Sequence, residues 1–245
     1  MELNTKPQFV NRVAPVEWEF LASVEKLAEI VRSHGYPCRA YSNKALAKLA
    51  ETSLEKKQVL ALQIKSILEI VSSAQIDKEV PTNEHPERSL IEQALKSCGL
   101  NARTEFWDNL AKDDVVEVYS LENVQLFRTF NFFTISSYSI LDLLINEWYF
   151  LWERPSYVLE SLMKLYEELI GGQFTTTRKV EVRPHLLKEI YDDNSQTEFK
   201  SSSVMITPQV MSPLYDDNGD LKGFLFTLRG TVMGHDSDAD KIAIL

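Results

Sequence analysis

The chain has 245 residues, of which 44% are hydrophobic, and its formal net charge is −10. This length and composition indicate a soluble globular protein with one large core or two smaller ones. No apolar run approaches the ~18 to 20 residues that span a bilayer, and the first residues lack the apolar region of a secretory signal, so we expect a cytoplasmic location.

The negative charge is concentrated in the later part of the chain. Residues 1–86 carry 11 basic and 11 acidic side chains, whereas the rest of the chain carries 15 basic and 25 acidic ones. A surface this acidic repels phosphate groups, so we expect no binding to nucleic acid.

Two amphipathic helices are predicted near the N-terminus. The first covers residues 15–33, where apolar residues recur every three or four positions. The second covers 42–73, with Ser42 or Asn43 as its N-cap and an apolar stripe along one side. This stripe consists of Leu46, Leu49, Leu60, Ile64, Ile67 and Val71. Two such helices cannot cover each other completely, so the stripe needs a further partner, either in the same chain or in a second copy.

A polar segment, 77–88, contains two prolines and no periodicity, which is typical of a linker. Short helices are predicted over 89–98 and 104–111, the first capped by Ser89 and ended by Gly99. Strands are predicted over 115–120, 124–130 and 173–183, with helices between 136 and 170. Residues 184–201 fit either a helical turn or a continued strand, and an acidic tail, 236–245, ends the chain.

Residues 204–232 are predicted to form a β-hairpin. Two runs rich in β-branched and aromatic residues flank an acidic segment, in which Asn218 and Gly219 are the pair that tight hairpin turns favour. In the second run, Phe224 and Phe226 alternate with less apolar residues, which predicts one sheet face to be buried.

This hairpin resembles the last hairpin of a PAS domain. The run SPLY before the acidic turn and the run GFLFTLRGT after it carry the resemblance. Upstream, residues 138–162 and the pair Gly171–Gly172 are similar to the helical segment of the same family, so the resemblance covers roughly 112–233. It implies an α+β fold, in which a PAS-like antiparallel sheet is covered by helices and preceded by an all-α helical hairpin.

The resemblance also implies a domain division and an oligomeric state. Residues 1–76 would be a helical dimerisation and output region, 77–88 a linker, and 89–235 the sensory domain. Helical extensions before PAS domains often mediate dimerisation, so we favour a homodimer that is held by the apolar stripe.

In a PAS fold, the space between sheet and helices is either a ligand cavity or a solid core. The candidate ligand-binding residues are aromatic, and aromatic side chains at such spacings commonly just fill a core. These candidates are Phe127, Trp148, Trp152, Phe224 and Phe226.

The sequence predicts no cofactor and no metal site. The flavin-binding run of the PAS family is absent from the sequence, and 136–170 lacks a histidine for haem, which leaves His185 as a remote candidate. Cys38 and Cys98 lie far apart without a CxxC pair and are predicted to be buried thiols.

Three functions are compatible with these features. We favour a bacterial-type cytoplasmic signalling protein whose sensory domain binds a small molecule or a protein partner and signals through the N-terminal helices. The first alternative is a structural adaptor that uses a solid sheet as a protein-binding surface. The second is an enzyme on a similar α+β fold. A cavity in which a carboxylate and a histidine converge would favour this alternative. Because the sequence shows no evident nucleophile with a base, no enzyme is expected.

Overall fold

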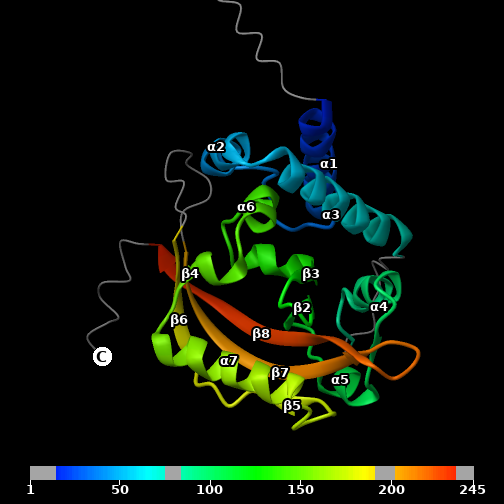
Figure 1. Ribbon diagram of the computed structural model, residues 1–245. Coiled ribbons are helices and arrows are strands. Elements are labelled where there is room, and N and C mark those ends of the chain that lie inside the picture. The colour runs from blue at the N-terminus through cyan, green and yellow to red at the C-terminus, as the bar shows by residue number, and fades with distance from the viewer. Residues whose placement is uncertain (1–14, 75–83, 191–201, 236–245) are drawn as a thin grey trace, which may run out of the picture.

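In the computed structural model, helices surround a curled antiparallel sheet, so the chain has the predicted α+β composition (Figure 1). The structure describes residues 15–74, 84–190 and 202–235. Most of the predicted linker and all of the predicted acidic tail lie outside these ranges. Within these ranges, we find no helix with the length and apolarity needed to cross a membrane.

The helices and strands follow one another in a mixed order. The α-helices are α1 (Pro15–Ser33), α2 (Asn43–Glu51), α3 (Leu54–Ser73), α4 (Arg88–Ser97), α5 (Thr104–Asn109), α6 (Ile140–Ile145) and α7 (Ser156–Ile170), and the 3₁₀ helices are η1 (Phe130–Thr134) and η2 (Trp148–Phe150). The strands are β1 (Asn101–Ala102), β2 (Val115–Ser120), β3 (Gln125–Arg128), β4 (Trp152–Glu153), β5 (Arg178–Lys179), β6 (His185–Glu189), β7 (Ser202–Tyr215) and β8 (Leu221–His235).

The sheet is built around the predicted hairpin, which is strands β7 and β8. The strand order is β3-β2-β8-β7-β6-β4, and β1 and β5 each pair with β7. Every pairing is antiparallel. In the turn, only Gly219 takes a positive φ, at 84°, and the carboxylate of Asp216 accepts the N–H groups of Asn218 and Asp220. The prediction of a tight turn at Asn218 and Gly219 is therefore wrong. The connection between β7 and β8 is wider, and the carboxylate of Asp216 stabilises it.

Both faces of the sheet are buried, whereas the sequence predicts one. Phe224 and Phe226 pack with Tyr119 and α7 on one face. Leu225, which lies between them, is fully buried on the opposite face. The prediction fails because the sheet has helices on both sides: α7 runs along β7, while α4 and α5 cover the other face (Figure 1).

The N-terminal helices differ from the prediction in one respect. The first has the predicted bounds, but the second is divided into α2 and α3 at Thr52 and Ser53, which both adopt extended backbone. Ser53 accepts the N–H of Lys56 and so caps α3, just as Ser42 caps α2. The extended backbone at these two residues thus ends α2, and the cap at Ser53 begins α3.

The apolar stripe packs inside the chain. Its exposed fractions are 1% at Leu49, 3% at Leu60, 0% at Ile64 and 5% at Val71, while Leu46 and Ile67 are half-buried against the same core. This core is continuous from Phe20 in α1 to Leu225 in β8, so the predicted boundary between helical and sensory regions does not separate two cores. The stripe therefore gives no support to a homodimer, which remains a prediction.

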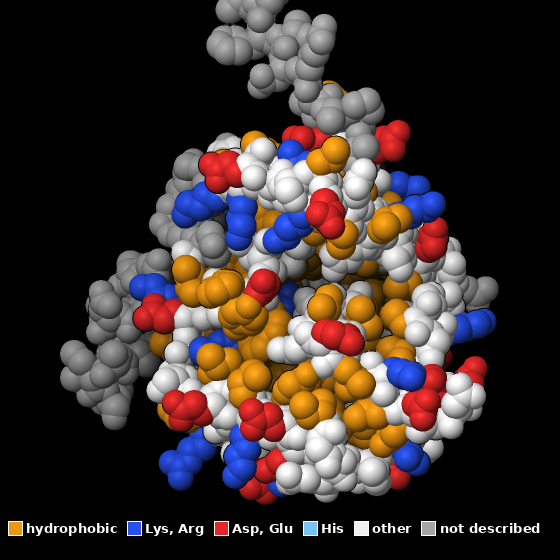
Figure 2. Space-filling view, in the orientation of Figure 1, with side chains coloured by type: hydrophobic (Ala, Val, Ile, Leu, Met, Phe, Trp, Pro, Cys, Tyr) orange, Lys and Arg blue, Asp and Glu red, His pale blue; other side chains and the backbone are white. Residues whose placement is uncertain are grey.

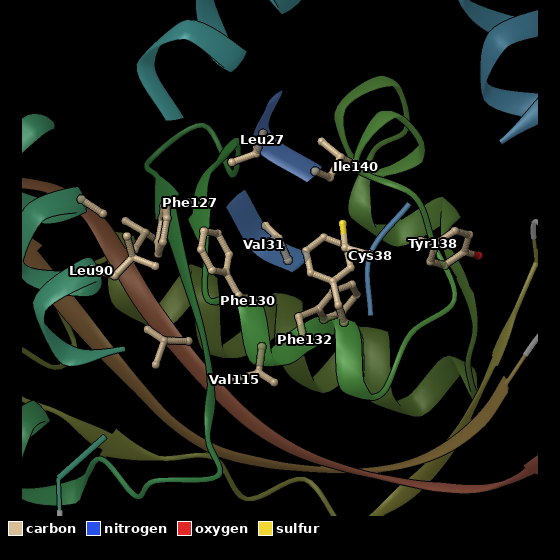
Figure 3. Packing of buried hydrophobic residues seen from close by; sticks show 14 of the residues in the cluster. Leu27, Val31, Cys38, Leu90, Val115, Phe127, Phe130, Phe132, Tyr138 and Ile140 are labelled. Atoms are coloured by element: carbon tan, nitrogen blue, oxygen red, sulfur yellow. The ribbon is translucent and has the colours of Figure 1, made fainter. Parts of the chain in front are cut away.

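Side chains from distant parts of the sequence meet in this core. Figure 3 shows Leu27 and Val31 of α1 directed toward Phe130 of η1 and Ile140 of α6. A polar contact also joins α2 to α6, since the hydroxyl of Ser42, the N-cap of α2, donates to the carboxylate of Asp142 in α6 at 2.9 Å in a buried site.

Two connecting segments become ordered structure. The first part of 184–201 is strand β6, so the continued strand was the correct alternative there, while 191–201 lies outside the described residues. Within the predicted linker, His85 and Glu87 are buried, at 2% each. Glu87 precedes α4, and its carboxylate accepts the backbone N–H groups of Phe130 and Asn131. The expected Ser89 cap is wrong, because α4 begins at Arg88.

Candidate functional site

A cavity lies between α7 and the face of the sheet that carries Phe224 and Phe226. The accessible space within it is about 80 Å³, and the hollow measures about 830 Å³ with its open mouth included. One water molecule needs roughly 10 to 15 Å³ of accessible space, so the cavity is large enough for part or all of a small organic molecule. Figure 2 shows hydrophobic side chains gathered around a hollow in this face of the molecule.

Four of the five predicted ligand-binding residues line this cavity. They come from η2, β4 and β8, and they are Trp148, Trp152, Phe224 and Phe226. The fifth, Phe127, does not reach it and lies in the main core with Leu27 and Val31, near α1 (Figure 3). Because successive side chains of a strand point to opposite faces, the residue of β3 that reaches the cavity is Arg128. The prediction for Phe127 placed it on the wrong face.

A hydrogen-bonded group of polar side chains lies in the cavity wall on β2 and β3. The Nε and Nη2 atoms of Arg128 are each 2.7 Å from Oε1 of Glu117. The hydroxyl of Tyr119 donates to Oε2 of the same carboxylate at 2.8 Å. Both side chains of the ion pair are more than nine-tenths buried, with exposed fractions of 9% and 8%. Burial raises the pKa of Tyr119 well above its ordinary value, and the charge of Glu117 raises it further, so the phenol is neutral.

Aromatic rings support both arginines of the cavity. The guanidinium carbon of Arg128 lies 4.0 Å from the centre of the Phe132 ring, and that of Arg154 lies 4.9 Å from the Trp148 ring. Stacking of this kind stabilises a cation in a partly desolvated site. Burial lowers the pKa of Arg154, while the nearby Tyr119 and Glu117 act in the opposite direction. An arginine nevertheless stays protonated in proteins, so Arg154 is a partly buried cation whose Nε is inaccessible to solvent.

His185 also lines the cavity, at the start of β6. Its Nδ1 lies 3.0 Å from the backbone carbonyl of Arg183, which fits a proton on Nδ1. Burial lowers the pKa of His185, the carbonyl of Arg183 opposes this, and the positive charge of Arg154 lowers it further. The imidazole is therefore neutral near pH 7.

Three N–H donors in the cavity wall have no hydrogen-bond acceptor among the described residues. They are Nη1 of Arg128, Nε of Arg154 and Nε1 of Trp148. Buried donors are nearly always paired with protein or solvent, and an unpaired one destabilises the fold. Three such donors in the wall of one cavity indicate a site built for an acceptor.

The sequence analysis predicted none of the charged residues or tyrosines of this cavity as ligand-binding residues. It named His185, but only as a remote candidate for a haem ligand. A signal was present, because Glu117 and Arg128 are the charged residues of two predicted strands that are rich in apolar residues. A charged residue in a buried strand needs a partner, and these two residues are each other's partner. Arg154 lies in a connecting segment, where the sequence gives no sign that its side chain faces a cavity.

The cavity shows no metal-binding arrangement, and none occurs elsewhere in the described ranges, where no group of three His, Cys, Asp or Glu side chains is placed to hold an ion. No family model matches the chain, and no curated protein matches it. Its function is therefore inferred from the geometry of the cavity.

Proposed function

We propose that the protein is a sensor that binds a small molecule between α7 and the curled sheet, in a PAS-like domain. The observation that carries this proposal is the cavity, whose wall is mainly apolar and aromatic with a few convergent polar groups, as ligand sites commonly are. The resemblance of residues 112–233 to PAS domains supports it. The solid-sheet adaptor is less favoured, because a sheet that only bound protein would not need a hollow lined with buried donors.

The signal would leave the cavity through η1. Phe132 of η1 lies under Arg128 at the cavity and also belongs to the core shared with the N-terminal helices. Two residues earlier, Phe130 contacts His34 and Tyr36, which follow α1, with ring centres 6.1 and 6.3 Å apart. A ligand that favours one position of the Arg128 side chain would shift the packing of η1 and hence of α1. The output partner is proposed to be a protein, since the acidic charge disfavours nucleic acid.

The proposed site can be tested by filling it. We expect native mass spectrometry to detect a bound small molecule on the wild-type protein. Leu162 of α7 lines the cavity, so Leu162→Trp should fill the cavity and abolish this binding. The control is Ser161→Trp, because Ser161 is exposed on the same helix. Loss of the bound mass in Leu162→Trp alone supports the proposal. A wild-type protein that carries no compound, and binds none from a metabolite extract, contradicts it.

An enzyme is a second candidate, because Glu117 and His185 both line the cavity. Against it, each carboxylate oxygen of Glu117 already accepts a hydrogen bond, which weakens this residue as a base. Neutral His185 is then the remaining candidate base. We expect the mass of the retained compound to stay unchanged during incubation with either the wild type or His185→Asn. Conversion by the wild type but not by His185→Asn would favour the enzyme over the sensor.

A further inference from the structure

We propose that the ligand of this cavity is a monoanionic organic acid, most simply a carboxylate on an apolar body, whose charged end is bound by Arg154 and Arg128. This inference rests on the proposed ligand-binding function and adds the chemical class of the ligand. It comes from three properties of the cavity wall: its charge, its unpaired donors and its apolar surface.

The charge of the wall is positive by one unit. The described residues that line the cavity include two guanidinium groups, Arg128 and Arg154, and one carboxylate, Glu117. Glu117 is paired with Arg128, so the charge of Arg154 is left without a carboxylate in the wall. Arg154 is partly buried, and a charge withdrawn from solvent without a partner is unfavourable, so a bound anion of charge −1 would remove the imbalance. A dianion would replace it with an imbalance of the opposite sign.

The unpaired donors belong to the same side chains. Arg154 and Trp148 are stacked, and each has a buried N–H without an acceptor among the described residues. Arg128 uses Nε and Nη2 for Glu117, while its Nη1 has no acceptor in the described ranges. A carboxylate has two oxygens that can accept several N–H groups at once, which fits donors supplied by more than one side chain. An alcohol or amide ligand would satisfy fewer of them and would leave the charge of Arg154 uncompensated.

The rest of the wall fits an apolar body. Aromatic and aliphatic side chains from α7, β7 and β8 face the cavity, including Leu162, Met211, Phe224 and Phe226. These side chains offer no hydrogen bonds to a polyhydroxylated molecule such as a sugar. The cavity therefore combines a cationic end with an apolar wall, which is the complement of an amphiphilic acid.

Matched acids and amides test this inference. Phenylacetate, hexanoate and octanoate, each with its primary amide, would be titrated into the purified full chain by isothermal titration calorimetry. Each amide keeps the shape of its acid but lacks the charge. Because hydrogen bonds to a charged group contribute about 1.5 to 3 kcal/mol, at least one acid should bind roughly 10- to 150-fold more tightly than its amide.

Arginine variants identify the group that binds the charge. Arg154→Met keeps much of the side-chain volume and breaks no ion pair with another described residue, so the fold should survive and the acid should lose its advantage over the amide. Arg178→Met is the matched control, because Arg178 also lies over an aromatic ring, Phe174, but is exposed and lies outside the cavity. This control should bind the acid as the wild type does.

Each result decides between the two proposals. Equal affinity of the wild type for acids and amides overturns the anion inference and leaves the ligand-binding function intact. Absence of binding by every acid overturns the inference, and only the additional absence of a retained compound on the native protein overturns the ligand-binding function. If Arg154→Met weakens acid and amide equally, the arginine shapes the cavity and does not bind the charge.

Discussion

Replacing Ile64 with glutamate should unfold the protein and should not release folded monomers. The side chain of Ile64 in α3 is fully buried in the core that α3 shares with α1. Truncation of a buried aliphatic residue costs about 2 to 5 kcal/mol, and an unpaired buried carboxylate adds to this cost. We therefore expect a loss of at least ~4 kcal/mol, which is most of the stability of a protein near the low end of the usual range of about 5 to 15 kcal/mol. Urea denaturation followed by circular dichroism measures it.

The control for this variant is Leu62→Glu on the same helix. Leu62 is 70% exposed, so the same added charge should change the free energy of unfolding by no more than about 0.5 kcal/mol. One outcome would support the predicted homodimer. If Ile64→Glu stays folded at wild-type stability while its sedimentation coefficient falls, the stripe is an interface between two chains and not part of one core.

Removing the carboxylate of Glu87 should cost about 2 to 6 kcal/mol, although the sequence places this residue in a polar linker. The carboxylate accepts the backbone N–H groups of Phe130 and Asn131 at the start of η1. Glu87→Ala would leave the buried N–H of Phe130 and the partly buried N–H of Asn131 without this acceptor, at about 1 to 3 kcal/mol each. Chemical denaturation measures this loss, and Glu92→Ala is the control. Glu92 is exposed and, within the described part of the chain, pairs only with Arg88 on the same helix, so its removal should cost less than about 1 kcal/mol.

The contribution of Glu87 should also depend on pH. Burial raises its pKa in the folded protein above the ordinary 4.5, although hydrogen bonds from Phe130, Asn131 and Tyr36 oppose this shift. An acid with a raised folded-state pKa stabilises the fold most below its unfolded pKa and loses this contribution as pH rises through the folded pKa. The difference in unfolding free energy between wild type and Glu87→Gln should therefore shift against the wild type as pH increases above 4.5. A shift in favour of the wild type would mean that the hydrogen bonds outweigh burial.

The sequence determined those parts of the protein that depend on neighbouring residues. The period of apolar residues located α1 with its bounds, and the alternation of apolar residues flanking Gly219 located the hairpin of β7 and β8. The cap at Ser42 was also correct. Each of these features arises from hydrogen bonds and side-chain periods within a few residues, so a short stretch of sequence contains the information.

Only the tertiary structure decided what each surface packs against. The sequence showed that the stripe with Ile64 needed a partner, but a second chain and the rest of the same chain bury the same apolar area, so the pattern could not distinguish them. The sequence identified four of the aromatic residues of the cavity but placed Phe127 there in place of Arg128, because the face of a short strand depends on which neighbours cover it. Arg154 and Glu87 could not be found from the sequence for a related reason. Each lies between elements of secondary structure, where no period reports burial, and only the fold brings Glu87 to the backbone of Phe130 and Arg154 into the same cavity wall as Glu117.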